Sequence, residues 1–99
     1  MAMTPERRVK NQVRKLLDKL GAYYSMPVTS GYGNSGAPDF LACIKGRFVG
    51  IECKSNGNKP TPLQEKNLRD IELSGGISLV VDETNVDNLE TKLSSVITN

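Results

Sequence analysis

The segment from residue 39 to residue 54 constrains the fold of this chain most, because it reads as two strands joined by a tight turn. Apolar runs at 41–44 and 47–50 flank Lys45-Gly46. A residue followed by glycine between two apolar runs is typical of a β-hairpin with a two-residue turn. We therefore expect a hairpin here, with a register that follows from the position of the turn.

This register places charged residues opposite one another at the open end of the hairpin. If Ile44 faces Arg47, Asp39 lies directly opposite Glu52, with β-carbons about 5 Å apart. Lys54 lies on the same face, because side chains alternate along a strand. Two carboxylates and a lysine on one face form a candidate metal site.

Facing carboxylates on buried strands cost free energy unless their charge is compensated. Repulsion between Asp39 and Glu52 would raise one pKa strongly, and a bound divalent cation removes that penalty. Carboxylate oxygens with a carbonyl and waters are the ligands that Mg²⁺ or Mn²⁺ prefers. Lys54 could then orient a water or stabilise charge on a phosphate. The alternative interpretation is that Lys54 only neutralises the two acids in a salt bridge.

Length and composition fit a single folded domain over residues 1–99. Apolar residues make up 37% of the chain and charged residues 24%, as in globular rather than disordered proteins. No apolar run approaches the roughly 20 residues of a membrane span, and the start lacks the apolar core of a signal peptide. We therefore expect a cytoplasmic protein that does not enter a membrane.

The chain contains two cysteines and no histidine. In the proposed hairpin Cys43 and Cys53 point to opposite faces, so we expect no disulfide between them. The absence of histidine excludes histidine bases, serine–histidine triads and histidine metal sites. Any chemistry must therefore rely on carboxylates, lysine, hydroxyl groups and a hard metal ion.

Charge is unevenly distributed along the chain. Residues 1–20 carry six basic groups against two acids, and residues 45–69 carry six more against two acids, whereas six acids and one lysine follow from residue 70 onward. This pattern suits a polyanion bound on one side of the molecule. The alternative is a solvated helix face with no partner.

The other helices and strands are predicted from helix caps, from the spacing of apolar residues, and from the glycines and prolines that end an element. Thr4-Pro5 and Thr61-Pro62 are helix starts, the second with a glutamine placed for a capping box. The expected order is a helix at 5–20, a short strand within 22–28, the hairpin strands, a helix at 62–74, a strand at 77–81 covered on both faces, and a helix carrying an apolar stripe from 86 to 97. This α-β-β-β-α-β-α order predicts a small mixed β-sheet flanked by helices, with the crossover helix placing 77–81 parallel to a hairpin strand.

A glycine-rich loop precedes the hairpin. Residues 31–36 match the dinucleotide fingerprint G-x-G-x-x-G, and Glu52 follows at a suitable distance. The fingerprint must open a helix that receives the pyrophosphate, however, and here a proline and a strand follow. We interpret the segment as a flexible loop beside the hairpin site, with Tyr32 close to a substrate.

The site residues resemble a known family. Gly36-Ala37-Pro38-Asp39, then Glu52-Cys53-Lys54 after a strand–turn–strand, then Gln64 on the next helix, are similar to the motif of PD-(D/E)XK nucleases. An acid on the first helix, Glu6, and the short G-x-P-D form resemble the virus-type replication-repair nuclease domain, VRR-NUC. The resemblance spans roughly residues 5–81 and implies a restriction-endonuclease-like α/β core.

The resemblance also implies roles for individual residues. Asp39 and Glu52 would be the metal ligands, helped by the backbone carbonyl of Cys53, and Lys54 would position or activate the attacking water. The implied cofactor is Mg²⁺ or Mn²⁺.

Two further site residues carry alternatives. Glu6 would reach the same centre from the first helix, directly or through water. Alternatively, it would only interact favourably with the dipole at the start of that helix. Gln64 would contribute to the site or hold the phosphate backbone, or would serve only in the capping box. Basic residues that would contact phosphates are Arg7, Arg8, Lys10, Lys59, Lys66 and Arg69.

Stand-alone members of this family resemble structure-selective DNA endonucleases of phages, similar in architecture to Holliday-junction resolvases. The resemblance therefore implies a DNA substrate, branched or four-way, and a two-fold homodimer that supplies two active sites. The alternatives are a nuclease acting on flaps, ends or single strands, an inactive DNA-binding module, and a small interaction protein.

Overall fold

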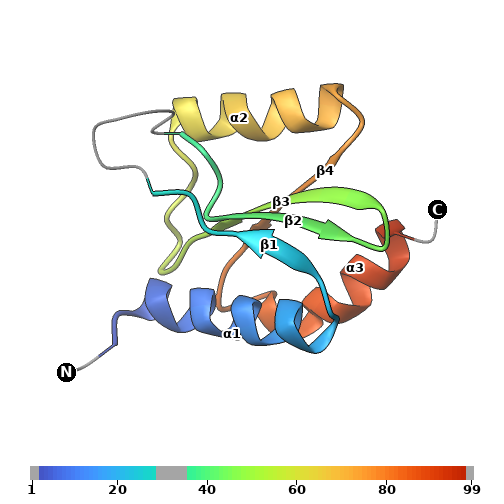
Figure 1. The fold of residues 1–99 in the computed structure, drawn as a ribbon. Helices are drawn as coiled ribbons and strands as arrows, with labels where there is room; N and C mark the ends of the chain where they lie inside the picture. Colours follow the sequence, from blue (N-terminus) through green and yellow to red (C-terminus); the bar gives the residue numbers. More distant parts are fainter. Residues whose placement is uncertain (1–2, 29–35, 98–99) are drawn as a thin grey trace.

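The computed structural model describes residues 3–28 and 36–97. The elements in order are α1 (Pro5–Lys19), β1 (Tyr23–Ser25), β2 (Phe40–Ile44), β3 (Arg47–Cys53), α2 (Pro62–Leu73), β4 (Ile77–Val81), the 3-10 turn η1 (Val86–Asn88) and α3 (Leu89–Ile97). The sheet order is β1-β2-β3-β4, antiparallel up to β3, with β4 parallel to β3. Helix α2 covers one face of the sheet, and α1 and α3 cover the other (Figure 1). The predicted small mixed sheet flanked by helices is confirmed.

The central hairpin has the predicted turn and register. Lys45 and Gly46 both have positive φ, 49° and 82°, as a type I′ turn requires. Ile44 pairs with Arg47, and the register continues to Phe40 opposite Ile51. The hairpin is therefore fixed by its turn, and the open end carries the residues of interest.

Helix α1 is held on the sheet by its apolar stripe. Val9, Val13 and Leu17 recur at helical spacing and are buried in the same core cluster as Phe40 of β2 and Ile51 of β3. All five are at most 1% exposed, and each such side chain contributes roughly 1.5–3 kcal/mol by leaving water. This packing fixes the position of α1 relative to the end of the hairpin.

The two cysteines are unpaired, as predicted, with Cys43 exposed and Cys53 buried. No helix in residues 3–28 and 36–97 has the length and apolar character needed to cross a membrane. Tyr32, which we expect near a substrate, lies outside the described residues.

The expectation that the strand at 77–81 is covered on both faces is wrong. β4 is the last strand of the described sheet, and Val80 is 39% exposed. Its side chain lines a groove beside α2 that also contains Leu68 and Arg69. The apolar run at 77–81 is therefore an edge strand on which only Val81 is buried and the other residues are half-buried or exposed.

Candidate active site

The predicted site lies at the open end of the hairpin. Asp39 directly precedes β2, Glu52 lies near the end of β3 and Lys54 follows it. Because both strands of the hairpin meet here, residues separated by more than a dozen positions come together. Helices α1 and α2 both begin at this end of the sheet (Figure 1).

Asp39 is held by the backbone of the opposite strand. Its Oδ2 accepts a hydrogen bond of 2.8 Å from the backbone N–H of Cys53, one residue beyond the predicted partner Glu52. Its Oδ1 lies 3.3 Å from Nζ of Lys10 on α1. Both oxygens are thus oriented by the fold, one by β3 and one by α1.

Glu52 is the most unusual carboxylate of the described chain. The residue is 3% exposed, and Oε2 lies 3.5 Å from Nζ of Lys54. Its other oxygen, Oε1, is buried without a hydrogen-bond partner among the described residues. Burial, and then the nearby charge of Asp39, raise the pKa of Glu52 to about 7, although Lys54 acts in the opposite direction. The lysine alone therefore does not compensate the buried charge.

Lys54 is held by contacts with β4 and with Glu52. Its side chain is 13% exposed, and its backbone N–H donates to the carbonyl of Val81 on β4 at 2.9 Å. The salt bridge with Glu52 that we considered as the alternative interpretation is present. It leaves Oε1 of Glu52 unsatisfied, so it does not account for the whole site.

The structure adds Lys10, which the sequence motif does not include among the site residues. Its Nζ lies 3.6 Å from Oε2 of Glu6 and 3.3 Å from Oδ1 of Asp39, between two carboxylates from different elements. Burial lowers the pKa of Lys10, but the charge and hydrogen bond of Asp39, together with the charge of Glu6, outweigh burial, so the net shift is upward. The i, i+4 spacing from Glu6 is the signal that could have pointed to it.

Glu6 is brought to the same centre by α1. Its charge acts on Glu52 together with that of Asp39, and Lys10 links it to Asp39. Glu6 is also the acid in the first turn of α1. Its position is thus compatible with both interpretations of the sequence.

Gln64 forms the capping box of α2. Its Oε1 accepts from the backbone N–H of Thr61 at 2.9 Å, and its own N–H donates to Oγ1 of Thr61 at 3.2 Å. The side-chain oxygen is thus engaged within α2. A role of Gln64 in the site remains a prediction.

Cys53 contributes its backbone rather than its thiol to this end of the sheet. The side chain belongs to the core, and burial raises the pKa of the thiol. A thiolate ligand is therefore disfavoured, and the backbone carbonyl remains the predicted contribution of Cys53 to a metal.

The donor set fits a hard cation with few protein ligands. Among the described residues no group of three or more histidine, cysteine, aspartate or glutamate side chains is arranged to hold a metal. Mg²⁺ commonly uses one or two carboxylates and completes its shell with water and substrate phosphates. Asp39 and the unpartnered oxygen of Glu52 fit this description.

The fold and the site together describe a small α/β domain with a carboxylate–lysine centre. A solved structure described as "VRR_NUC domain" is similar to this chain, with a TM-score of 0.75, 27% sequence identity, and coverage of 90% of this chain and 97% of that chain. No family model and no curated protein matches the sequence. The predicted resemblance to a VRR-NUC domain is confirmed, and such a domain indicates a nuclease.

Proposed function

We propose that this protein is a metal-dependent, structure-selective DNA endonuclease that hydrolyses phosphodiester bonds in branched DNA such as four-way junctions. The observation that carries this proposal is the buried, unpartnered oxygen of Glu52 beside Asp39 and Lys54. A carboxylate oxygen kept in this state is suited to a cation. The similarity to a VRR-NUC domain supports a nuclease as its use.

In this proposal each side chain has a distinct task. Asp39 and Glu52, with the carbonyl of Cys53, would hold Mg²⁺ or Mn²⁺. The bound ion supplies a Lewis acid for the phosphoryl oxygen and lowers the pKa of a bound water. Lys54, fixed by β4, orients the attacking water and stabilises negative charge on the phosphate. Glu6 reaches the centre from α1, directly or through a water.

The test is a cleavage assay on matched substrates. Labelled four-way junction, flap, single strand and linear duplex are each incubated with Mg²⁺, Mn²⁺ or chelator. We expect metal-dependent cutting with preference for the junction. No cutting of any substrate would favour an inactive DNA-binding module, whereas equally fast cutting of duplex would contradict structure selectivity but keep the nuclease.

Asp39→Asn and Glu52→Gln are expected to abolish cutting, by at least about a hundredfold, and to leave DNA binding largely intact. Both changes keep the size of the side chain and remove only the charge that holds the cation. Asp70→Asn on α2, whose carboxylate pairs with Lys66 at 2.8 Å, is the matched control and should cut like the wild type. Loss of folding in the two site variants would favour the salt-bridge interpretation.

A further inference from the structure

A groove of about 630 Å³ runs along α1 directly beside the candidate active site, and it contains two of the site's own residues, Glu6 and Lys10. Arg7, Asn11 and Arg14 line the same groove. Arg7, Lys10, Asn11 and Arg14 are spaced at i, i+3, i+4 and i+7, so they form one continuous stripe along the helix. We call these four residues the groove stripe.

We infer that this groove binds the backbone of the nucleic-acid strand that is cut, with Arg7 and Arg14 as its phosphate contacts. The choice of ligand rests on the proposed nuclease function. The two arginines are seven residues apart, which corresponds to about 10 Å along a helix. A B-form strand advances about 3.4 Å per phosphate, so the stripe spans about three nucleotides.

The arginines of the stripe are available for a ligand. Both are exposed, and neither has an ion-pair partner among the described residues. Lys10, in contrast, is occupied by the two carboxylates of the site. Arg7 and Arg14 therefore place free positive charge on either side of Lys10, which contacts Glu6 and Asp39 of the candidate active site.

The groove also offers an apolar lining. Met3 and Met26 contribute to it, and they are 42% and 41% exposed. Flexible thioether side chains adapt to varied apolar surfaces. A strand whose phosphates face the arginines can thus place sugars or bases against the methionines.

A second groove of about 610 Å³ is the alternative site for phosphates, but its charge excludes it as the main phosphate site. It lies beside α2 and β4, and its charged residues are Lys59, Glu65, Arg69, Glu72 and Asp82. Two cations there face three carboxylates, whereas the groove along α1 has three cations and one carboxylate. Phosphates therefore favour the groove along α1.

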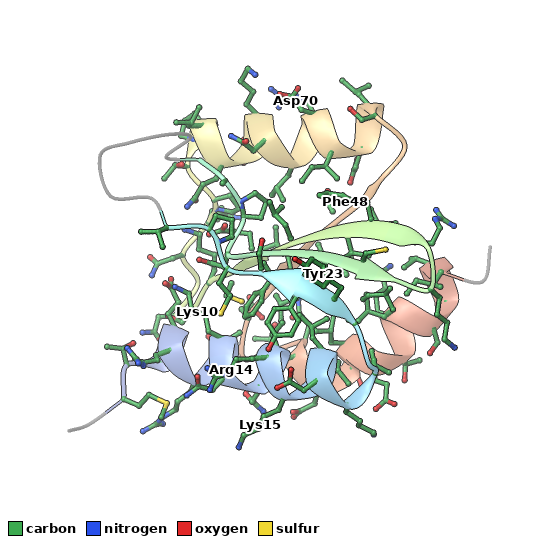
Figure 2. All side chains as sticks on the ribbon, viewed as in Figure 1. Lys10, Arg14, Lys15, Tyr23, Phe48 and Asp70 are labelled. Carbon is green, nitrogen blue, oxygen red and sulfur yellow. The ribbon has the colours of Figure 1, made fainter. Side chains whose placement is uncertain are left out.

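The binding test compares two double charge reversals. Arg7→Glu with Arg14→Glu reverses the two arginines of the groove stripe, and Lys15→Glu with Lys92→Glu makes the same change in net charge. Lys15 and Lys92 are also exposed, but they do not line the groove, and Lys15 extends from α1 away from the sheet (Figure 2). Affinity for labelled single strand, duplex and junction is measured by anisotropy, in chelator and in Ca²⁺.

We expect the stripe variant to lose at least about tenfold in affinity and the control about twofold or less. The slope of log affinity against log salt should fall by about 2 in the stripe variant, one for each lost phosphate contact. Thermal unfolding by circular dichroism verifies that both variants remain folded. Equal loss in both variants, or no binding by the wild type in either condition, overturns the inference.

Two further outcomes separate this inference from the proposed function. If Lys59→Glu with Arg69→Glu weakens binding and the stripe variant does not, the groove is wrong while the nuclease stands. If the wild type binds through the stripe but cuts no substrate with Mg²⁺ or Mn²⁺, the nuclease is wrong while the groove stands.

Discussion

Glu52 combines burial, an unpartnered oxygen and a neighbouring carboxylate, and these features make its negative charge costly in the folded protein. The pKa of Glu52 is raised from 4.5 to about 7. The folded state thus holds the proton more tightly than the unfolded state does. Below pH 4.5 both states are protonated and nothing is lost, but stability falls as pH rises toward 7 and the loss is complete above it.

Glu52→Gln is therefore expected to raise the stability of the metal-free protein at pH 8, by at most about 3 kcal/mol. The gain should disappear near pH 4, because wild-type Glu52 is then neutral as well. Thermal unfolding in chelator across this pH range measures the effect. A variant that is less stable than wild type at pH 8 would show that the ion pair with Lys54 outweighs the burial of Glu52.

Lys10 occupies the space between two carboxylates that a cation would also use. Lys10→Met keeps most of the side-chain volume and removes the charge, so we expect Mn²⁺ to bind about tenfold more tightly, which is about 1.4 kcal/mol. Isothermal titration measures this without any cleavage. Lys15→Met, on the opposite side of α1, is the control and should leave the affinity unchanged. An unchanged affinity in Lys10→Met would mean that the ion does not use the carboxylates that Lys10 contacts.

For individual residues, the sequence predicts the contacts that follow from the hairpin register. It does not predict the contacts that depend on how a helix packs on the sheet. Asp39 and Glu52 meet because a two-residue turn fixes every facing pair. Lys10 joins them only because α1 packs on the sheet through Val9 and Val13. No local rule gives the rotation of a helix about its axis to within one side chain.

The start of α2, like that of α1, could serve the site or only the helix. Thr61 and Gln64 cap each other, and removal of either cap partner should cost about 1 kcal/mol. We expect Thr61→Ala and Gln64→Ala to lower stability by similar amounts. If the cap is the only role of Gln64, the two variants also cut equally fast.

A comparison of cleavage rate with thermal stability for Thr61→Ala and Gln64→Ala distinguishes a role of Gln64 in the site from a role in the helix cap alone. The VRR-NUC resemblance leads us to expect that Gln64→Ala loses more than about tenfold in rate beyond Thr61→Ala. Equal rates would assign Gln64 to the cap alone.

Element boundaries were predictable where the signal is local. The caps at Thr4 and Thr61 placed α1 and α2 within a residue or two. The edge position of β4 was not predictable, because an apolar run does not state how many neighbours its strand has. The reason for Gly36 also appears only in three dimensions: a β-carbon there would lie 2.8 Å from the carbonyl oxygen of Leu63 on α2.

On the scale of the whole molecule, the sheet separates the basic residues of α1 from those of α2. Helix α1 carries all six basic residues of the first segment, whereas α2, on the opposite face, carries only Lys66 and Arg69 of the second (Figure 1). A polyanion on the face of α1 therefore does not meet the basic residues of α2, and the free arginines of the groove stripe favour the face of α1. The sequence shows two basic segments, but only the topology shows that their helices lie on opposite faces of the sheet.

The size of the chain bears on how it would cut a branched substrate. The longest extent of the described protein is 36 Å, close to one turn of B-DNA at about 34 Å, and the proposed site is one per chain. One site cannot act on two strands at symmetric positions at the same time. A second copy related by a two-fold axis supplies the second site in the matching orientation.

We therefore expect a homodimer in solution, with a mass of twice 10.8 kDa, and paired incisions at symmetric positions in a four-way junction. Light scattering coupled to gel filtration gives the mass, and labels on each strand in turn give the cut positions. Mixing wild type with Asp39→Asn is the decisive arm, because mixed dimers with one active site should nick one strand and leave the other intact. A monomeric mass with paired cuts would contradict the dimer, since one chain would then visit both strands in succession.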